Sequence, residues 1–392
     1  MNTIISFLES SQPDFLTDLA VLVNLDCGTH NKAGVDQAGE WISSRCVAWG
    51  WEVQHFPLVE YGDCWLARLR GQGTGRLLLM GHLDTVYPDG TAAIRPMRFE
   101  GPHILGPGVC DMKGGLLVGM YALRALQMTG FTDFAELAFF FNSEEELGSP
   151  ISRTLYTPVV QPMDAALVLE AARMNGDIVS ARKGAGVYTV RVKGKAAHAG
   201  VEPEKGANAI LELAHQVIAF QKLNGLVPGV TVNAGVISGG TQHNVVPEEA
   251  QLDVDVRATD LAGVAAIRHA IAHLNGQTTV PGAQVYIQGG FSYFPMAKTP
   301  ATAFLVELAQ DVAQELGFET KDAATGGASD ANMIAALGVP VLDGLGPVGG
   351  LDHGPDEYIE QASIVPRTVL LVGLIQRILA SREALAGLRN PL

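Results

Sequence analysis

Long apolar runs in the first half of the chain predict buried strands, each of which ends at an acidic or polar residue. The runs show no regular polar alternation, as is typical of strands covered on both faces by helices. Between two of them, residues 114–128 repeat apolar positions at helical spacing. This alternation indicates an α/β domain with a mixed, largely parallel sheet between helices. The strands are predicted over residues 76–82, 136–142 and 165–170.

The pattern changes after about Arg182 to strands that alternate apolar and polar positions, which is typical of an antiparallel sheet with one solvated face. Strands are predicted over residues 187–193, 230–237, 250–257 and 284–288, and helices over 206–222 and 262–274. Two helices against an antiparallel sheet form an α+β layer. From Thr299 the first pattern returns, with a helix over 303–316, a strand over 340–342 and a closing helix over 363–380. The sequence therefore predicts one domain from residues 1–182 and 295–392, and a second domain inserted at 183–294.

Length and charge narrow the class of protein. A chain of 392 residues is too long for one ordinary core, so two domains are expected. The net charge of -15 argues against a nucleic-acid or anionic-membrane partner. No stretch reads as long and apolar enough to span a bilayer, and acids near the start favour an amphipathic helix over a signal peptide. We expect a cytoplasmic protein whose four cysteines, which lack CxxC spacing, are small buried apolar residues.

Five segments that end or follow apolar runs carry the candidate chemistry. Because the carboxyl ends of strands in open α/β sheets form the usual ligand site, we expect several of these segments to meet there. Their histidine, aspartate and glutamate residues are ligand types that zinc accepts. One such segment means little, but five in one chain predict two metal ions and hydrolysis of an amide. The segments are residues 80–88, 106–115, 142–149, 167–170 and 351–358.

His82 and Asp84 form an H-x-D pair at the end of a predicted strand. Alternation along a strand places both side chains on one side. We expect His82 to bind metal through one ring nitrogen while Asp84 accepts a hydrogen bond from the other. A purely structural pair is the alternative. Asp111 lies among glycines that allow close approach, and it is a candidate to bridge two cations or to cap the following helix.

Further acids follow the other predicted strands. Glu144, Glu145 and Glu146 repel one another unless cations or solvent relieve them, so a solvated turn is the alternative to a metal site. Glu170 ends an apolar strand and, if buried, needs a partner such as a cation. His353 completes the set, with a surface loop histidine as the alternative.

Taken together, the motifs resemble those of a known family. GHLDTVYP, GPGVCDMKGG, EELGS, GKAAHAG and the loop 326–330 stand in the order and spacing of the zinc-dependent aminoacylase and carboxypeptidase family. That family includes acetylornithine deacetylase and succinyl-diaminopimelate desuccinylase, and the pattern is most similar to its glutamate carboxypeptidases. The resemblance covers nearly the whole chain, and the motifs are specific as a set.

The resemblance implies two Zn²⁺ ions per subunit, with Co²⁺ or Mn²⁺ as possible substitutes. Glu145 would be the general base, Asp84 would orient His82, and a cis peptide would join Asp111 to Met112. The implied zinc ligands are His82, Asp111 and Glu170 for one ion, and Asp111, Glu146 and His353 for the other.

The resemblance also implies a lid at residues 183–294 that forms a homodimer. His198 would reach the partner's site and stabilise the oxyanion. Asn244 and Arg257 would contact the substrate, and Arg257 would bind the carboxylate of the substrate. Taken alone, these three residues favour structural roles. Glutamate-specific members carry an arginine where Phe291 stands here, which argues for a more apolar C-terminal residue.

The implied activity is hydrolysis of the amide next to the C-terminal amino acid of a small peptide. An N-acyl-amino-acid deacylase of the same fold is the first alternative, because both reactions break an amide beside a carboxylate. A non-catalytic metal-binding protein ranks lower, since the general base and all the ligands are present. An aminopeptidase needs an acidic group for the free amine, and Arg257 argues against it.

Overall fold

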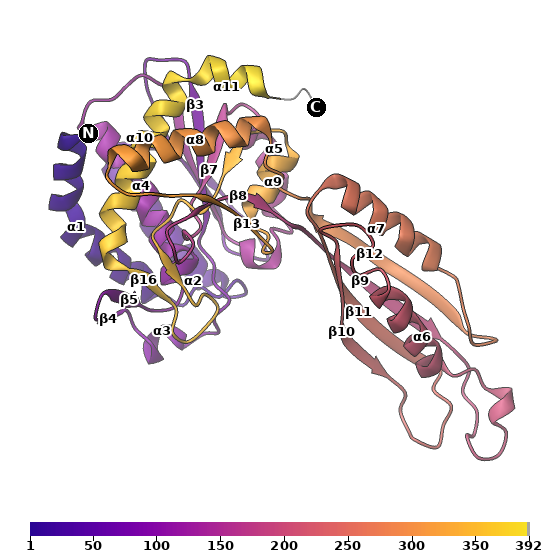
Figure 1. The fold of residues 1–392 in the computed structure, drawn as a ribbon. Helices are drawn as coiled ribbons and strands as arrows, with labels where there is room; N and C mark the ends of the chain where they lie inside the picture. The colour runs from indigo at the N-terminus through magenta and orange to yellow at the C-terminus, as the bar shows by residue number, and fades with distance from the viewer. Residues whose placement is uncertain (390–392) are drawn as a thin grey trace. The chain divides into compact units, whose positions relative to one another are not determined.

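The computed structural model describes residues 1–389, which divide into two compact units (Figure 1). The first unit comprises Met1–Ala181, Lys298–Ala324 and the chain from Ser329 onward. The second comprises Arg182–Ala297 together with the short loop Thr325–Ala328. The sequence placed the borders near these positions but left the loop in the first domain. Periodicity follows the chain continuously, so it does not reveal contacts made by a distant loop.

A six-stranded mixed sheet forms the centre of the first unit, in the order β1-β2-β6-β3-β7-β14. β3 is parallel to both β6 and β7, and β7 is parallel to β14, whereas β1, β2 and β6 pair antiparallel. This arrangement confirms the predicted fold class. The strands are β1 (Glu52–Phe56), β2 (Cys64–Arg70), β3 (Arg76–His82), β6 (Glu136–Asn142), β7 (Ala165–Val168) and β14 (Val341–Leu342).

Helices pack around this sheet and bury its apolar strands. Phe139, Phe140 and Phe141 of β6 are at most 1% exposed, because both faces of the strand are covered. The helices are α1 (Asn2–Val23), α2 (Lys32–Ala48), α3 (Thr91–Ile94), α4 (Gly114–Met128), α5 (Tyr156–Val160), α8 (Pro300–Glu315), α9 (Asp330–Ala336), α10 (Ile364–Ala380) and α11 (Arg382–Leu388). The four cysteines are free and buried, as predicted.

One helical stretch corrects a prediction. Gln361–Ala380 is long and apolar enough to cross a membrane by length and composition, although the sequence was expected to hold no such stretch. Within the described residues, 67% of its apolar window is buried. The helix α10 packs against α1, α4 and α8, so its apolar character is that of a core helix.

Short strands complete the first unit. They form a four-stranded sheet in the order β15-β16-β5-β4, and β8 pairs with β13 in a two-stranded sheet. These strands are β4 (Arg98–Glu100), β5 (His103–Leu105), β8 (Ile178–Arg182), β13 (Asp322–Thr325), β15 (Gly349–Gly350) and β16 (Tyr358–Glu360).

The second unit is an antiparallel sheet in the order β10-β11-β9-β12, with two helices. Its own core includes Val190, Val254 and Ile267, each fully buried, which confirms the α+β layer. β12 is longer than predicted, because Gly289 and Gly290 interrupt the alternation while the backbone stays paired with β9. The elements are β9 (Gly184–Lys193), α6 (Ala209–Gln221), β10 (Thr231–Gly239), β11 (Glu249–Ala258), α7 (Leu261–Leu274) and β12 (Gln284–Tyr293).

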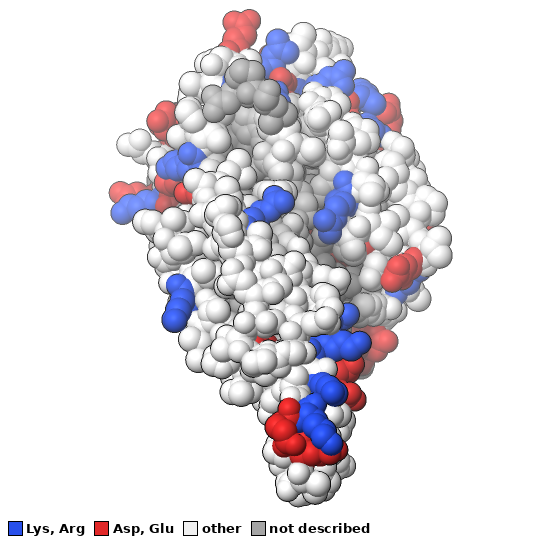
Figure 2. Space-filling model, turned by 90° about the vertical axis from the view of Figure 1, so that its right-hand side faces the viewer, with Lys and Arg blue, Asp and Glu red and all other residues white. Residues whose placement is uncertain are grey.

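The surface charges are mixed. Among the described side chains drawn in Figure 2, basic and acidic residues are interspersed and form no continuous basic stripe on that face. A stripe of one sign is the usual electrostatic footprint of a nucleic-acid-binding surface.

Candidate functional site

Residues from three segments of the first unit meet at the carboxyl ends of its central strands. His82 ends β3, Glu145 and Glu146 follow β6, and Glu170 lies two residues after β7. The strand predicted to run to residue 170 stops at Val168, so Glu170 belongs to the loop beyond it. Parallel strands end at one sheet edge, which explains why residues distant in sequence come together there.

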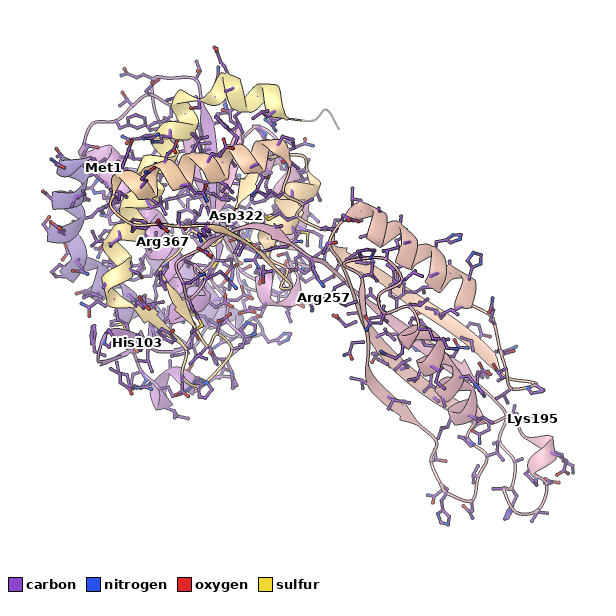
Figure 3. All side chains as sticks on the ribbon, in the orientation of Figure 1. Met1, His103, Lys195, Arg257, Asp322 and Arg367 are labelled. Carbon is purple, nitrogen blue, oxygen red and sulfur yellow. The ribbon has the colours of Figure 1, made fainter. Side chains whose placement is uncertain are left out.

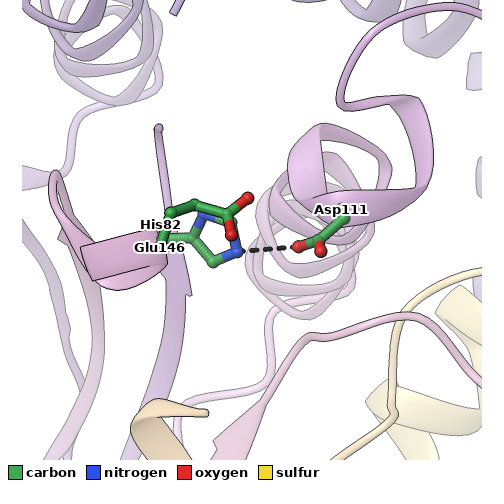
Figure 4. A group of neighbouring side chains, drawn as sticks. All are labelled: His82, Asp111 and Glu146. Carbon is green, nitrogen blue, oxygen red and sulfur yellow. Dashed lines mark hydrogen bonds and ion pairs between the residues drawn. The ribbon is translucent and has the colours of Figure 1, made fainter. Parts of the chain in front are cut away.

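Asp111 lies between two histidines, and a different oxygen of its carboxylate contacts each of them. Its Oδ1 is 2.9 Å from His82 Nε2, and its Oδ2 is 3.1 Å from His353 Nε2 (Figure 4 shows the first contact). Glu170 Oε1 lies 3.7 Å from the same nitrogen of His82. Glu146 Oε2 lies 3.4 Å from Nε2 of His353. The structure thus brings together two groups of three side chains that have Asp111 in common.

The electrostatics of this cluster are those of acids crowded in a buried place. Burial raises the pKa of Glu145 well above its usual value, and the charges of Asp330, Glu170 and Glu146 add to the effect. Burial also raises the pKa of Glu146. For Asp111, hydrogen bonds with the two histidines outweigh burial and lower the pKa.

The cluster fits divalent cations by its donor set and by one unpaired atom. Single ligand atoms of His82, Asp111 and Glu146 lie within 4.8 Å of one another. Glu146 Oε1 is buried without a hydrogen-bond partner among the described residues. A buried carboxylate oxygen without a partner is costly unless a cation neutralises it. Nitrogen and carboxylate ligands in this combination suit zinc and related metals.

Asp84 supports both the histidine and the acidic turn. His82 Nδ1 lies 2.9 Å from the backbone oxygen of Asp84 and 3.3 Å from its carboxylate Oδ1. The same carboxylate accepts hydrogen bonds from the backbone N–H groups of Glu145 and Glu146, at 3.1 and 3.2 Å, and from the Thr29 hydroxyl at 2.7 Å. The sequence predicted only the contact with His82. The position of the acidic turn therefore also depends on Asp84.

Two further buried acids escaped the sequence analysis as positioning residues. Glu357 accepts hydrogen bonds from the backbone N–H groups of Gly108, Cys110 and Asp111 at 2.8 to 2.9 Å, and from the Tyr87 hydroxyl at 2.6 Å. It therefore fixes the loop that presents Asp111. Its place four residues after His353, inside the segment 351–358, was the available signal.

Asp330 plays the corresponding part for the acidic turn. It accepts hydrogen bonds from Asn142, Ser149 and Tyr156, at 2.9, 2.9 and 2.6 Å, and so ties the two ends of the turn to α9. The loop 326–330 carried part of the family resemblance, but no role was derived for this residue.

The three consecutive acids have different surroundings. Glu144 Oε1 accepts hydrogen bonds from the backbone N–H groups of Ile151 and Ser152, so its side chain holds the turn. Glu145 and Glu146 belong to the cluster. Of the two readings of this acid run, a solvated turn does not fit, because Glu144 is fully buried and Glu145 is only 9% exposed.

The remaining candidates lie in the second unit. His198 is exposed, its Nδ1 accepts a hydrogen bond from Gly200 N at 3.2 Å, and the neighbouring Ala199 N donates to Asn244 O at 3.0 Å. His198 and Asn244 therefore lie on adjacent segments. Arg257 of β11 (labelled in Figure 3) pairs with Asp255 at 3.0 Å and donates to the Gly326 carbonyl at 2.7 Å. The roles of these residues in catalysis stay predictions.

The cis peptide bond implied by the resemblance is present between Asp111 and Met112.

The chain is similar to known proteins over most of its length. Residues 78–377 match the model of peptidase family M20/M25/M40. The chain is 29% identical over 390 residues to carboxypeptidase G2 of Pseudomonas sp. (strain RS-16), covering 95% of this chain and 91% of that protein. It is 26% identical over 381 residues to succinyl-diaminopimelate desuccinylase of Xanthomonas oryzae pv. oryzae, covering 91% and 99%.

Solved structures show the same fold. Aminopeptidase PepT of Bacillus cereus ATCC 10987 superposes with a TM-score of 0.79 at 24% identity, covering 94% of this chain and 98% of that one. The Bacillus subtilis YXEP protein, described as a dinuclear metal-binding peptidase from the M20 family, superposes with a TM-score of 0.69 at 15% identity, covering 95% and 99%. With the family match over most of the chain, these findings show that the chain belongs to peptidase family M20/M25/M40 and is a metal-dependent hydrolase.

Proposed function

We propose that this enzyme binds two Zn²⁺ ions and hydrolyses the amide next to the C-terminal amino acid of small peptides. The observation that carries the proposal is the carboxylate of Asp111, whose two oxygens face His82 and His353 separately. His82, Asp111 and Glu170 would hold one ion, and Asp111, Glu146 and His353 the other. When bound, the ions supply Lewis acidity and lower the pKa of the attacking water.

The residues of the chain divide the remaining work. Glu145 takes the proton from the attacking water and passes it to the leaving nitrogen. The raised pKa of its buried carboxyl suits a group that both accepts and returns a proton. Asp84 holds His82 and the turn that carries Glu145. In the proposed homodimer, His198 reaches the site of the neighbouring subunit and stabilises the oxyanion of the tetrahedral intermediate there.

Similarity to carboxypeptidase G2 along nearly the whole chain supports the carboxypeptidase assignment. An N-acyl-amino-acid deacylase is the second candidate, favoured by the similarity to succinyl-diaminopimelate desuccinylase. The test is a panel of dipeptides and N-acyl amino acids, with and without Zn²⁺ after chelation, in which the C-terminal residue is Glu, Asp, Leu, Phe or Lys. Metal-dependent release from dipeptides supports the first candidate. Release from N-acyl amino acids alone supports the second, and release from neither overturns both.

Arg257 is expected to bind the carboxylate of the released residue. Its replacement by alanine should lower kcat/KM about 10- to 100-fold for substrates with a free C-terminal carboxylate, because a charge-assisted hydrogen bond is lost. Substrates with an amidated C-terminus should respond far less. The measurement is steady-state kinetics on matched acid and amide pairs. Arg191, an exposed arginine of the neighbouring strand β9, provides the matched control substitution. Equal losses on both members of a pair would assign Arg257 a structural role.

Metal binding should become more stabilising as the pH rises. Hydrogen bonds with Asp111 and Glu146 raise the pKa of His353 to about 11, so the metal-free protein holds a proton there at neutral pH. A group whose pKa is higher in the folded than in the unfolded protein stabilises the fold at pH values below its unfolded pKa. This stability is lost as the pH rises toward the folded pKa. Cations compete with that proton.

The difference in Tm between zinc-loaded and chelated protein should therefore grow between pH of about 6 and 9. Scanning calorimetry at several pH values measures it, with the same buffers and chelator throughout. A difference that stays constant or shrinks over this range would contradict the expected competition between proton and metal.

The second unit supports the expected homodimer by its exposed edge. β10 is an edge strand, and its Val236 and Ile237 are 62% and 60% exposed. Ile218 of α6, which packs beside β10, is 56% exposed. Apolar residues beside an unpaired strand edge favour pairing with a second chain. Light scattering on wild type and on Ile218→Asp tests this, and a monomeric wild type would contradict it.

A further inference from the structure

Two histidines lie one turn apart on the exposed side of α7, a helix of the second unit (Figure 1). His269 and His273 are both exposed, whereas Ile267 and Ile271 belong to the core of this unit. Side chains four residues apart are neighbours on the surface of a helix. Here the Nε2 atoms of the two imidazole rings are 2.9 Å apart, and the rings meet edge to face. Two ring nitrogens therefore come together at one point of the surface.

The surroundings of this pair favour a small cation. Ala265 stands one turn before His269 and Ala272 stands between the two histidines, and both alanines are exposed and too short to cover the rings. His273 lies in the last turn of α7. The backbone carbonyls at the end of a helix have no partner within the helix, so this end carries a partial negative charge. A cation at the two nitrogens gains from that charge.

The spacing of the two nitrogens indicates which kind of ion fits. An imidazole nitrogen lies about 2.0–2.1 Å from a bound divalent transition metal. Two such nitrogens are roughly 2.9 Å apart when they meet the ion at a right angle, and roughly 3.3 Å apart at a tetrahedral angle. The 2.9 Å between His269 and His273 matches the right angle. Right angles are typical of the square-planar and tetragonal sites of Cu²⁺ and Ni²⁺, whereas Zn²⁺ prefers a tetrahedral site.

We propose that His269 and His273 form a surface site for a divalent transition metal, with Cu²⁺ as the preferred ion. Among the divalent ions of the first transition row, Cu²⁺ also binds nitrogen ligands most tightly. The ion replaces the hydrogen bond between the rings. The imidazole that donates through Nε2 carries its proton on Nδ1 instead, so both Nε2 lone pairs become available and no proton has to leave. Water fills the other positions around the ion.

This site is separate from the proposed amide hydrolysis. The pair belongs to the second unit, whereas the cluster around Asp111 belongs to the first. Replacement of both histidines by glutamine should therefore leave the catalytic metal content and the kcat/KM of the enzyme unchanged. The proposal does not depend on the substrate, because its test measures metal binding.

Calorimetric titration of the zinc-loaded protein with Cu²⁺, Ni²⁺ and Zn²⁺ tests the proposal. We expect one Cu²⁺ per chain in addition to the catalytic metal, with weaker binding of Ni²⁺ and the weakest binding of Zn²⁺. His269→Gln and His273→Gln should each weaken Cu²⁺ binding by about 10- to 100-fold, because a chelate is reduced to a single ligand. The variant with both substitutions should lose the site. Mass spectrometry before and after titration confirms that the catalytic metal has stayed in place.

His215→Gln is the matched control, because His215 is an exposed histidine of α6 in the same unit and has no other histidine one turn away. This variant should bind Cu²⁺ like the wild type. Electron paramagnetic resonance of the bound Cu²⁺ should show a tetragonal site with nitrogen ligands, and this signal should be absent from the variant that lacks both histidines. The proposal is overturned if that variant binds Cu²⁺ as tightly as the wild type, or if the wild type binds only the catalytic metal. Tighter binding of Zn²⁺ than of Cu²⁺ would overturn the proposed preference.

Discussion

Replacement of Glu145 by glutamine is expected to lower kcat by about 10²- to 10⁴-fold while the bound metal is retained. The amide has the shape of the carboxylate but cannot accept the proton of the attacking water. Its backbone N–H still donates to Asp84 Oδ1, so the turn should keep its position. Steady-state kinetics together with metal analysis by mass spectrometry measures both quantities on the same preparation.

Glu144→Gln is the matched control, because this residue is the preceding acid of the same turn and its side chain bonds the backbone at Ile151 and Ser152. We expect its kcat to remain within a few-fold of wild type, with a lower Tm. If Glu145→Gln kept its full metal content and turned over substrate at the wild-type rate, Glu145 would not be the general base. Loss of metal from that variant would instead assign it to the ligands.

Asp111→Asn should reduce the metal content below two ions per chain and lower kcat/KM by more than about 100-fold, the upper cost seen when only a partner of a metal ligand is removed. Asparagine offers one acceptor oxygen and no charge, whereas both oxygens of Asp111 are in use, one toward each histidine. Its amide nitrogen would face one of the histidines. Metal titration followed by calorimetry, alongside kinetics, gives the stoichiometry and the activity.

The control is Asp311→Asn, an exposed aspartate of α8 that is far from the cluster in sequence and pairs with Arg377. It should bind metal and turn over substrate like the wild type. Two fully bound ions in Asp111→Asn, with unchanged affinities, would show that Asp111 does not bridge them.

The sequence alone was sufficient for the elements that are buried on both faces. The predicted strands at Arg76–His82 and Glu136–Asn142 and the helix at Gly114–Met128 agree with the structure at both ends. Complete burial demands uninterrupted apolar residues, and the polar residue that follows marks the end of the strand. The elements between Lys32 and Arg70 were not predicted, because they carry mixed polar and apolar residues without a strong period.

The same physical reason explains which site residues could be found. The candidate metal ligands stand beside apolar or glycine-rich runs, where a charged or polar residue is easy to notice in a sequence. They are His82, Asp111, Glu146, Glu170 and His353. The meeting of His82, Glu146 and Glu170 at one sheet edge follows from the parallel pairing of β3 with β6 and β7. The residue types and the strand ends that carry them could therefore be predicted from the sequence, whereas the strand order is known only from the structure.

Only the tertiary structure decided how these side chains are held. Glu357 supports the loop of Asp111, Asp330 supports the acidic turn, and the carboxylate of Asp84 serves that turn as well as His82. The sequence determined which segments are buried, because burial depends on composition and period. Which buried donor meets which acceptor depends on the packing of segments up to 270 residues apart, and no local pattern encodes that choice.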